Sequence, residues 1–181
     1  MERLKQLRWS SIIKPSVMAL AFMLVHVSPA LSDSPRQRAT LAGLTGVGVV
    51  VEDMDPAAEK DGLTESTLQI EVELKLRQAG IRVLTSDERR AAPGNPYLYL
   101  RVGTFKNAQS DMGLYAFVVN LQLMQEVRLT RNPAITSLAI TWDAEGWVGI
   151  VGSRKLSQVR ERVRDVVDEF LNAYLAANPK R

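Results

Sequence analysis

Residues 115–129 read Tyr-Ala-Phe-Val-Val-Asn-Leu-Gln-Leu-Met-Gln-Glu-Val-Arg-Leu, and this stretch decides the fold. Apolar side chains recur at every second position along it except Gln125, and they form one face: Tyr115, Phe117, Val119, Leu121, Leu123, Val127 and Leu129. Polar residues dominate the opposite face: Asn120, Gln122, Glu126, Arg128 and Thr130. A period of two predicts a long antiparallel strand with one covered face and one open face.

Shorter strands are predicted on both sides of this stretch. Residues 44–51 are apolar and β-branched on both faces of the predicted strand, which is typical of a central strand. Alternation of Leu138, Ile140 and Trp142 predicts a strand after the turn at 131–133. Stretches with the character of a strand are residues 44–51, 81–85, 97–102, 115–129, 138–142 and 147–151, the last of which can also be a loop.

Two helices complete the expected set of elements. The first follows Thr64 as N-cap, carries an apolar stripe over residues 65–79 and ends at Gly80. The second covers residues 156–174, where apolar residues recur at intervals of three and four, and Asn178-Pro179 ends it. Residues 31–40 are polar and patternless, which predicts a flexible leader before a single domain of residues 41–181.

The order β-α-β-β-β-(β)-α predicts a two-layer α+β sandwich. We expect a mostly antiparallel sheet of four or five strands with both helices on one face. Residues 44–51, the first helix and residues 81–85 suggest a βαβ unit, whose crossover is right-handed if the strands are parallel.

The N-terminus predicts a cleaved signal peptide over residues 1–30. Four basic residues precede an apolar run of about a dozen residues that begins at Val17, which is too short for a membrane-spanning helix. Small residues then allow cleavage after Ala30 or after Ser32, and both sites stay open. The expected location is therefore periplasmic or secreted, with no transmembrane anchor after processing.

Removing the signal changes the charge of the chain. The full sequence has 23 Lys and Arg against 20 Asp and Glu. Removal of residues 1–30 takes away four basic residues and one acidic residue and leaves 19 of each. The basic residues near the C-terminus, Arg154 to Arg164, alternate with acids, and Arg164 and Asp168 form an i,i+4 pair, as on a solvated helix face. The pattern argues against a nucleic-acid partner.

Composition also restricts the chemistry that is available. The only histidine, His26, leaves with the signal, and the chain has no cysteine. A processed chain without either residue has no His-dependent triad, no thiolate nucleophile and no ordinary zinc or copper site. We therefore expect no enzyme, no cofactor and no metal, although carboxylate catalysis is not excluded by composition.

Carboxylates are the remaining polar candidates. A Ca²⁺ site could use the acidic stretch Glu52, Asp53, Asp55, Glu59 and Asp61, but the spacing departs from the EF-hand pattern. Acid–base pairs could be Asp143 with Glu145, or Asp53 with Asp55. The simpler interpretation is a solvated strand end followed by a helix N-terminus, and a turn at 143–146.

Aromatic residues indicate a surface for a partner. Tyr97, Tyr99 and Phe105 share one strand face, opposite the leucines of the same strand. If the leucine face is the core, the rings lie on the open sheet face, where Tyr and Trp are typical of protein interfaces. Trp142 and Trp147 flank one turn and can be core or surface. The candidate partner-binding residues are Tyr97, Tyr99, Arg101, Phe105 and Trp147.

Residues 168–180, Asp-Glu-Phe-Leu-Asn-Ala-Tyr-Leu-Ala-Ala-Asn-Pro-Lys, resemble the tail of a group of short exported bacterial proteins without an assigned function. Glu52-Asp53 before Gly62-Leu63-Thr64 is similar to the same group. The element order is similar to small periplasmic α/β modules, such as the N-terminal domain of TolB and the CsgG-like family. These resemblances imply an envelope setting and no catalytic residue.

Together these features predict an exported, non-catalytic binding or assembly domain that contacts another envelope protein, and an oligomer is possible. The alternative is a small-molecule or lipid carrier with a pocket between helices and sheet.

Overall fold

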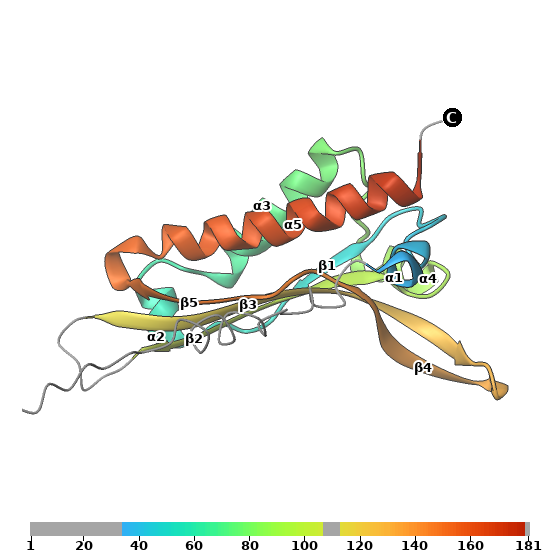
Figure 1. Cartoon of the computed structure of the whole chain (residues 1–181), viewed down its shortest axis with the longest axis horizontal. Coiled ribbons are helices and arrows are strands. Elements are labelled where there is room, and N and C mark those ends of the chain that lie inside the picture. Colours follow the sequence, from blue (N-terminus) through green and yellow to red (C-terminus); the bar gives the residue numbers. More distant parts are fainter. Residues whose placement is uncertain (1–33, 107–112, 180–181) are drawn as a thin grey trace, which may run out of the picture. The chain divides into compact units, whose positions relative to one another are not determined.

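The computed structural model describes residues 34–106 and 113–179, which form an α+β domain as predicted (Figure 1). The signal segment predicted at residues 1–30 lies outside the described residues. The α-helices are α1 (Pro35–Ala39), α2 (Pro56–Lys60), α3 (Glu65–Gln78), α4 (Ser86–Ala91) and α5 (Ser157–Ala177). The strands are β1 (Gly48–Val51), β2 (Tyr97–Lys106), β3 (Leu114–Leu129), β4 (Asn132–Asp143) and β5 (Trp147–Gly152), and a short 3-10 helix, Ser153–Lys155, precedes α5.

The long strand β3 organises the sheet. On one side it pairs antiparallel with β2, which in turn pairs parallel with β1. On its other side β3 is shared by two partners, because β5 pairs with its first half and β4 with its second half. Pairing with β2 stops at Met124, so the end of β3 continues with β4 as a two-stranded ribbon that protrudes from the sheet (Figure 1).

Helices α3 and α5 cover one face of the sheet (Figure 1). The predicted stripe of α3 is buried at Leu68, Val72 and Leu76, and Thr64 caps this helix by accepting a hydrogen bond from the Thr67 N–H. Gly80 follows the helix with φ +79°, a conformation that glycine adopts without strain. The core joins these helices to the inward face of β2 and β3, and its fully buried members include Leu98, Leu100, Val119, Leu121, Leu123, Val163, Val166 and Phe170.

Residues 81–85, predicted to be a strand, make only one parallel bridge, between Val47 and Val83. The extended run ends because Thr85 is the N-cap of α4 and forms a capping box with Glu88. Helix α2 was not predicted from the sequence. Asp55 caps it and Pro56 stands at its first position, although the same residues are also typical of a turn.

The flexible leader expected at residues 31–40 differs from the structure from Ser34 onward. Ser34 and Gln37 form a capping box that starts α1. The Thr40 hydroxyl then donates a hydrogen bond to the Thr141 carbonyl oxygen at 3.1 Å, and Leu41 is fully buried. A short polar helix has no apolar period, and its sequence signal is the capping-box pattern Ser34-Pro35-Arg36-Gln37, with Pro35 at the first helical position.

Candidate docking surface

Four of the five candidate partner-binding residues lie on the open face of the sheet. Tyr97, Tyr99, Arg101 and Phe105 alternate along β2 with residues that are buried beneath the helices. Phe105 has 70% of its surface exposed, Arg101 is also exposed, and the two tyrosines are half-buried. The structure therefore brings these four residues together on one surface.

Trp147 lies on the other face. It pairs across the sheet with Val119, whose side chain is buried under the helices. The guanidinium carbon of Arg162 in α5 lies 4.2 Å from the centroid of the Trp147 ring, which is a cation–π contact. Trp147 is thus at the margin of the helix-covered face, separate from the tyrosines and Phe105.

Trp142 belongs to the core. Its side chain is fully buried, and its ring meets the Phe170 ring edge to face, with 5.4 Å between the centroids. The neighbouring alternation was misleading, because a register shift between Leu123 and Met124 places Thr141 in a β-bulge. Ile140 pairs with Met124 and Trp142 with Leu123, so the two side chains point to opposite faces.

Apolar side chains cross the open face in two registered rows, which we call the apolar rows. Their members are Phe105, Ala116 and Ile150 in one row and Gly103, Val118 and Val148 in the next. Val148 is 82% exposed and Ile150 is 73% exposed. None of the six residues carries a charge, and an exposed continuous apolar patch is typical of an interaction surface.

A shallow hollow of about 330 Å³ lies over β2 and β3, where the apolar rows cross these two strands. Gly103 makes the hollow possible, because a Cβ at this position would come within 2.9 Å of Val118 Cγ1. The walls are formed by Phe105, Ala116 and Val118 among others, and they are almost entirely apolar. The hollow suits an apolar side chain of a partner better than a polar ligand.

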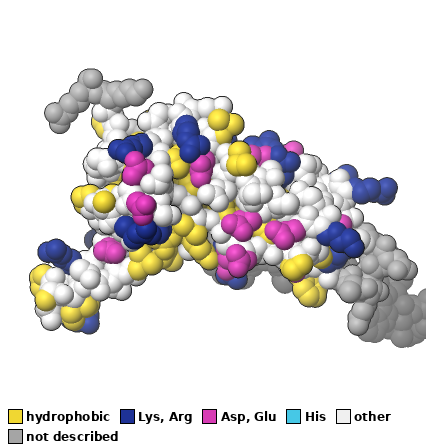
Figure 2. All heavy atoms as spheres, turned by 180° about the vertical axis from the view of Figure 1, so that it is seen from behind, with side chains coloured by type: hydrophobic (Ala, Val, Ile, Leu, Met, Phe, Trp, Pro, Cys, Tyr) yellow, Lys and Arg dark blue, Asp and Glu magenta, His cyan; other side chains and the backbone are white. Residues whose placement is uncertain are grey.

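The apolar surface continues onto the ribbon. Leu138 and Ile140 pair with Glu126 and Met124, so they share the open face, and both are about half exposed. Figure 2 shows hydrophobic side chains on the ribbon and along the margin of the body beside it. The sequence contains a signal for this surface, because the odd and the even positions of residues 147–151 both lack polar side chains. The same pattern equally predicts a strand that is buried on both faces.

A polar strip borders the apolar rows. Arg101 Nε lies 3.1 Å from Glu52 Oε2, and Glu52 also interacts with the Tyr99 hydroxyl. Burial is the main cause that raises the pKa of Tyr99, and the charge of Glu52 adds to it. Tyr99 therefore stays protonated and can donate a hydrogen bond at the border of the surface.

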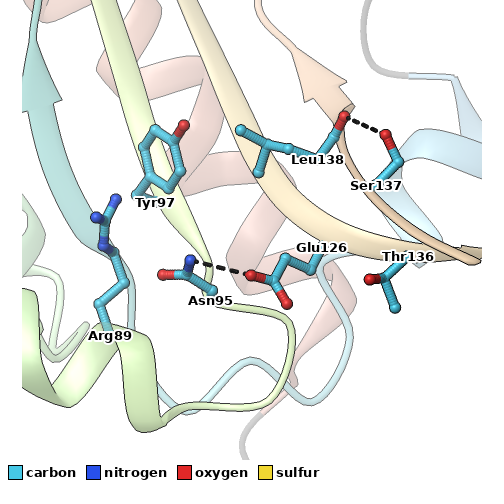
Figure 3. Close-up of a pocket in the computed structure, with 7 residues that line it drawn as sticks. All are labelled: Arg89, Asn95, Tyr97, Glu126, Thr136, Ser137 and Leu138. Carbon is cyan, nitrogen blue, oxygen red and sulfur yellow. Dashed lines mark hydrogen bonds between the residues drawn. The ribbon is translucent and has the colours of Figure 1, made fainter.

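A polar groove of about 350 Å³ lies between the start of β2 and the ribbon (Figure 3). Arg89 stacks over the Tyr97 ring, with 4.4 Å from its guanidinium carbon to the ring centroid. On the facing side, Asn95 Nδ2 donates a hydrogen bond to Glu126 Oε1 at 3.4 Å. Asn95 has φ +46°, in the left-handed region. The bond between Asn95 and Glu126 connects the base of the ribbon to the body.

Asp61, Lys106 and Tyr115 form a polar cluster. Lys106 Nζ and the Tyr115 hydroxyl each donate a hydrogen bond to Asp61 Oδ2 at 2.7 Å. These bonds lower the pKa of Asp61, and the bond to Asp61 raises the pKa of Lys106. Burial, followed by Asp61, raises the pKa of Tyr115. Each of these pKa values is shifted away from neutral pH, whereas acid–base catalysis requires a pKa near neutral pH.

The acidic stretch considered for Ca²⁺ is spread among separate partners. Glu52 pairs with Arg101, Asp55 Oδ1 accepts hydrogen bonds from the Ala57 and Ala58 N–H groups, and Asp61 belongs to the cluster above. Within residues 34–106 and 113–179, no group of three or more acidic, His or Cys side chains is arranged to hold a metal ion.

Asp143 and Glu145, a candidate acid–base pair, each form a hydrogen bond to a neighbouring helix. Asp143 Oδ1 accepts a hydrogen bond from Gln37 Nε2 of α1. The backbone N–H of Glu145 donates to Glu169 Oε2 of α5 at 2.9 Å. Both contacts attach the β4–β5 turn to neighbouring helices.

Basic residues of α5 contact the carboxylates of α3. Arg160 pairs with Glu71, and Arg164 Nε lies 3.9 Å from the same carboxylate. Asp168, expected to pair with Arg164, instead lies 2.7 Å from Lys75 Nζ. These contacts connect the two helices across their polar sides.

Among the helices that the structure describes, none has the length and apolar character needed to cross a membrane. No family model matches this chain, and no curated protein matches it.

Proposed function

We propose that this chain is an exported, non-catalytic binding domain of the cell envelope that docks a partner protein on its open sheet face. The observation that carries the proposal is the pair of uncharged apolar rows, in which Phe105, Val148 and Ile150 are each at least 70% exposed. The opposite face of the same sheet is already covered by α3 and α5. Docking would remove the apolar rows from water.

Binding is favoured over catalysis by the state of the ionisable groups. The pKa shifts of Asp61, Lys106 and Tyr115 hold each group in its ordinary form at neutral pH. A chain that loses His26 with its signal has no imidazole, and it has no thiol. Docking requires neither group, because shape and apolar contact supply its free energy.

Docking is also favoured over the carrier alternative, which needs a pocket between helices and sheet. Large side chains fill that space, including Trp142, Tyr115 and Phe170, all fully buried. The two hollows described above lie at the surface, one on the open face and one at the ribbon, and a third surface hollow lies beside β5. Surface hollows suit the side chains of a partner.

Export is part of the proposal and rests on the N-terminal sequence alone. A basic segment, a short apolar run and small residues at Ala30 and Ser32 are the features that signal peptidase substrates share. Mass spectrometry of the protein purified from its own host tests this directly. A mass beginning at Leu31 or Asp33 supports export, and an intact Met1 contradicts it.

The docking proposal is tested by affinity capture from an envelope extract, with Phe105→Asp as the disrupting variant. A charge in the apolar rows should abolish capture of the partner while the melting temperature stays unchanged. Ile70→Asp is the matched control, because Ile70 is 66% exposed but lies on α3, in the other layer. It should capture the partner normally.

Equal loss of capture in both variants would show that the added charge acts nonspecifically. Unchanged capture by Phe105→Asp would exclude the open face as the docking surface.

A further inference from the structure

Strand β5 is an edge of the sheet. In the part of the chain that the structure describes, it pairs with β3 and with no other strand. The Ser153 N–H donates to the Gly113 carbonyl at 2.8 Å, and these residues extend the β3–β5 register. Because antiparallel bonds alternate, Trp147, Gly149 and Val151 direct their backbone groups toward β3. Val148 and Ile150 therefore direct their N–H and C=O groups outward.

Bonds elsewhere on β3 agree with this alternation. The Leu121 carbonyl, at an odd position, accepts from the Ala144 N–H on the side of β4 and β5. The Glu126 N–H, at an even position, donates to the Gly94 carbonyl on the side of β2. Residues 115, 117 and 119 are also at odd positions, so their backbone N–H and C=O groups point toward β5.

The edge of β5 lacks the features that normally prevent strand pairing. Its sequence, Trp-Val-Gly-Ile-Val-Gly, contains neither a charged residue nor a proline, and its outward-bonding residues are also its most exposed ones. A groove of about 290 Å³ runs beside it, bounded on the helix side by Gln158, Glu161 and Arg162 of α5. Among the described strands none pairs with the outer side of β5, so a further strand can be added there.

We propose that this edge binds a second copy of the chain, with the two β5 strands antiparallel about a two-fold axis at Gly149. This register places Val148 opposite Ile150 of the second copy, and Ile150 opposite its Val148. Each such pair exchanges two backbone hydrogen bonds, so the outward groups of both residues are satisfied. The side chains form apolar cross-strand pairs on the open face.

The helix side of the same edge is also self-complementary. Gly149 faces its own copy at the axis, so no side chain separates the two strands there. Glu161 and Arg162 are neighbours on the α5 wall of the groove. A two-fold axis brings the same mixed-charge patch from both copies together, and opposite charges can then alternate across it. A self-complementary edge favours a second copy over an unrelated strand.

Pairing of this kind goes beyond docking of a partner, because it joins two open faces into one continuous sheet surface. Sedimentation equilibrium of the purified protein tests it over the micromolar range, where a modest interface is populated. We expect the mass to rise from monomer to dimer with concentration. Hydrogen exchange should slow at the amides of Val148 and Ile150 over the same range.

Val148→Pro is the informative variant, because the Val148 N–H points outward and takes no part in the ladder with β3. It should remain monomeric at every concentration, while Val148→Thr, which keeps the N–H and the β-branch, should still dimerise. Circular dichroism confirms that each variant is folded. If Val148→Pro unfolds, Ile150→Lys, which places a charge on the edge, replaces it with the same expectation.

A monomeric wild type at all concentrations, or a dimer that survives in a folded Val148→Pro protein, would overturn the proposal. Binding of an unrelated chain to the β5 edge, in place of a second copy, would also overturn it. Phe105→Asp separates this inference from the proposed function, because Phe105 is on β2, away from the edge. That variant should lose the partner and keep the dimer.

Discussion

The two faces of the sheet carry similar residues and have different surroundings. On β2, Leu98 and Leu100 point toward α3 and α5 and are fully buried, whereas Phe105 points away and is mostly exposed. On β5, Val151 is buried and Ile150 is exposed. Apolar composition therefore does not distinguish the core from the candidate docking surface. The distinction lies in whether a helix covers the face, and only the covered face contributes its apolar area to stability.

The difference leads to an ordered set of substitutions. Those on the covered face should reduce the free energy of unfolding, and those on the open face should reduce binding and leave stability unchanged. Substitutions at the margin between the faces should have intermediate effects.

The largest expected effect is that of Trp142→Ala. The side chain is fully buried and packs against Phe170, so truncation leaves a large cavity in the core. We expect a loss of about 3 to 5 kcal/mol in the free energy of unfolding. Urea denaturation measures it. A loss below about 1 kcal/mol, the range of a surface substitution, would show that Trp142 is not part of the core.

Tyr115→Phe should cost about 1 to 2 kcal/mol at neutral pH, since it removes a hydrogen bond to an ionised carboxylate. The lowered pKa of Asp61 means that this stabilisation is complete above the ordinary value of 3.8 and is lost as pH falls through the lower folded value. The cost of the substitution should therefore shrink in acid. Thermal melts at neutral pH and at a pH well below 3.8 measure the change.

Tyr174→Phe is the control for this pH dependence. The Tyr174 hydroxyl donates to the Leu44 carbonyl oxygen at 2.9 Å, and that acceptor does not titrate. Its cost should be the same at both pH values. An equal cost of Tyr115→Phe at both values would mean that Asp61 is not the acceptor that matters.

Trp147→Ala tests the margin between the faces. Loss of the contact with Arg162 should cost about 1 kcal/mol of stability, as measured by urea denaturation. Because Trp147 is on the helix-covered side, partner capture should stay intact. If capture is lost while stability is unchanged, Trp147 contacts the partner, and the docking surface extends around β5.

Periodicity predicted the layers because burial imposes a period on long elements. The alternation of residues 115–129 and the stripes of α3 and α5 each reflect one covered face, and the two-layer α+β class follows from them. Short helices were not predicted, because burial imposes no apolar period on them. The helices α1, α2 and α4 have five or six residues, and caps and tertiary contacts define them, with no apolar period.

The candidate surface was predicted in part, and a bulge explains why the sequence placed Ile140 and Trp142 on the same face. Alternation along β2 correctly separated Tyr97, Tyr99, Arg101 and Phe105 from the leucines. In β4, alternation placed Ile140 on the same face as Trp142, and the extra residue Thr141 reverses that relation. A bulge depends on the partner strand, so one strand's own pattern does not reveal it.

Phe105→Ser has the smallest expected effect on stability and tests the comparison most directly. The ring is largely exposed, so its removal should change the free energy of unfolding by no more than about 0.5 kcal/mol. Val102→Ser, three residues earlier on the same strand, replaces a side chain that is buried under the helices. That substitution should cost several times more, because it leaves a cavity and buries a hydroxyl. Parallel urea titrations give both values, and equal costs would mean that the open face is already covered in the folded chain.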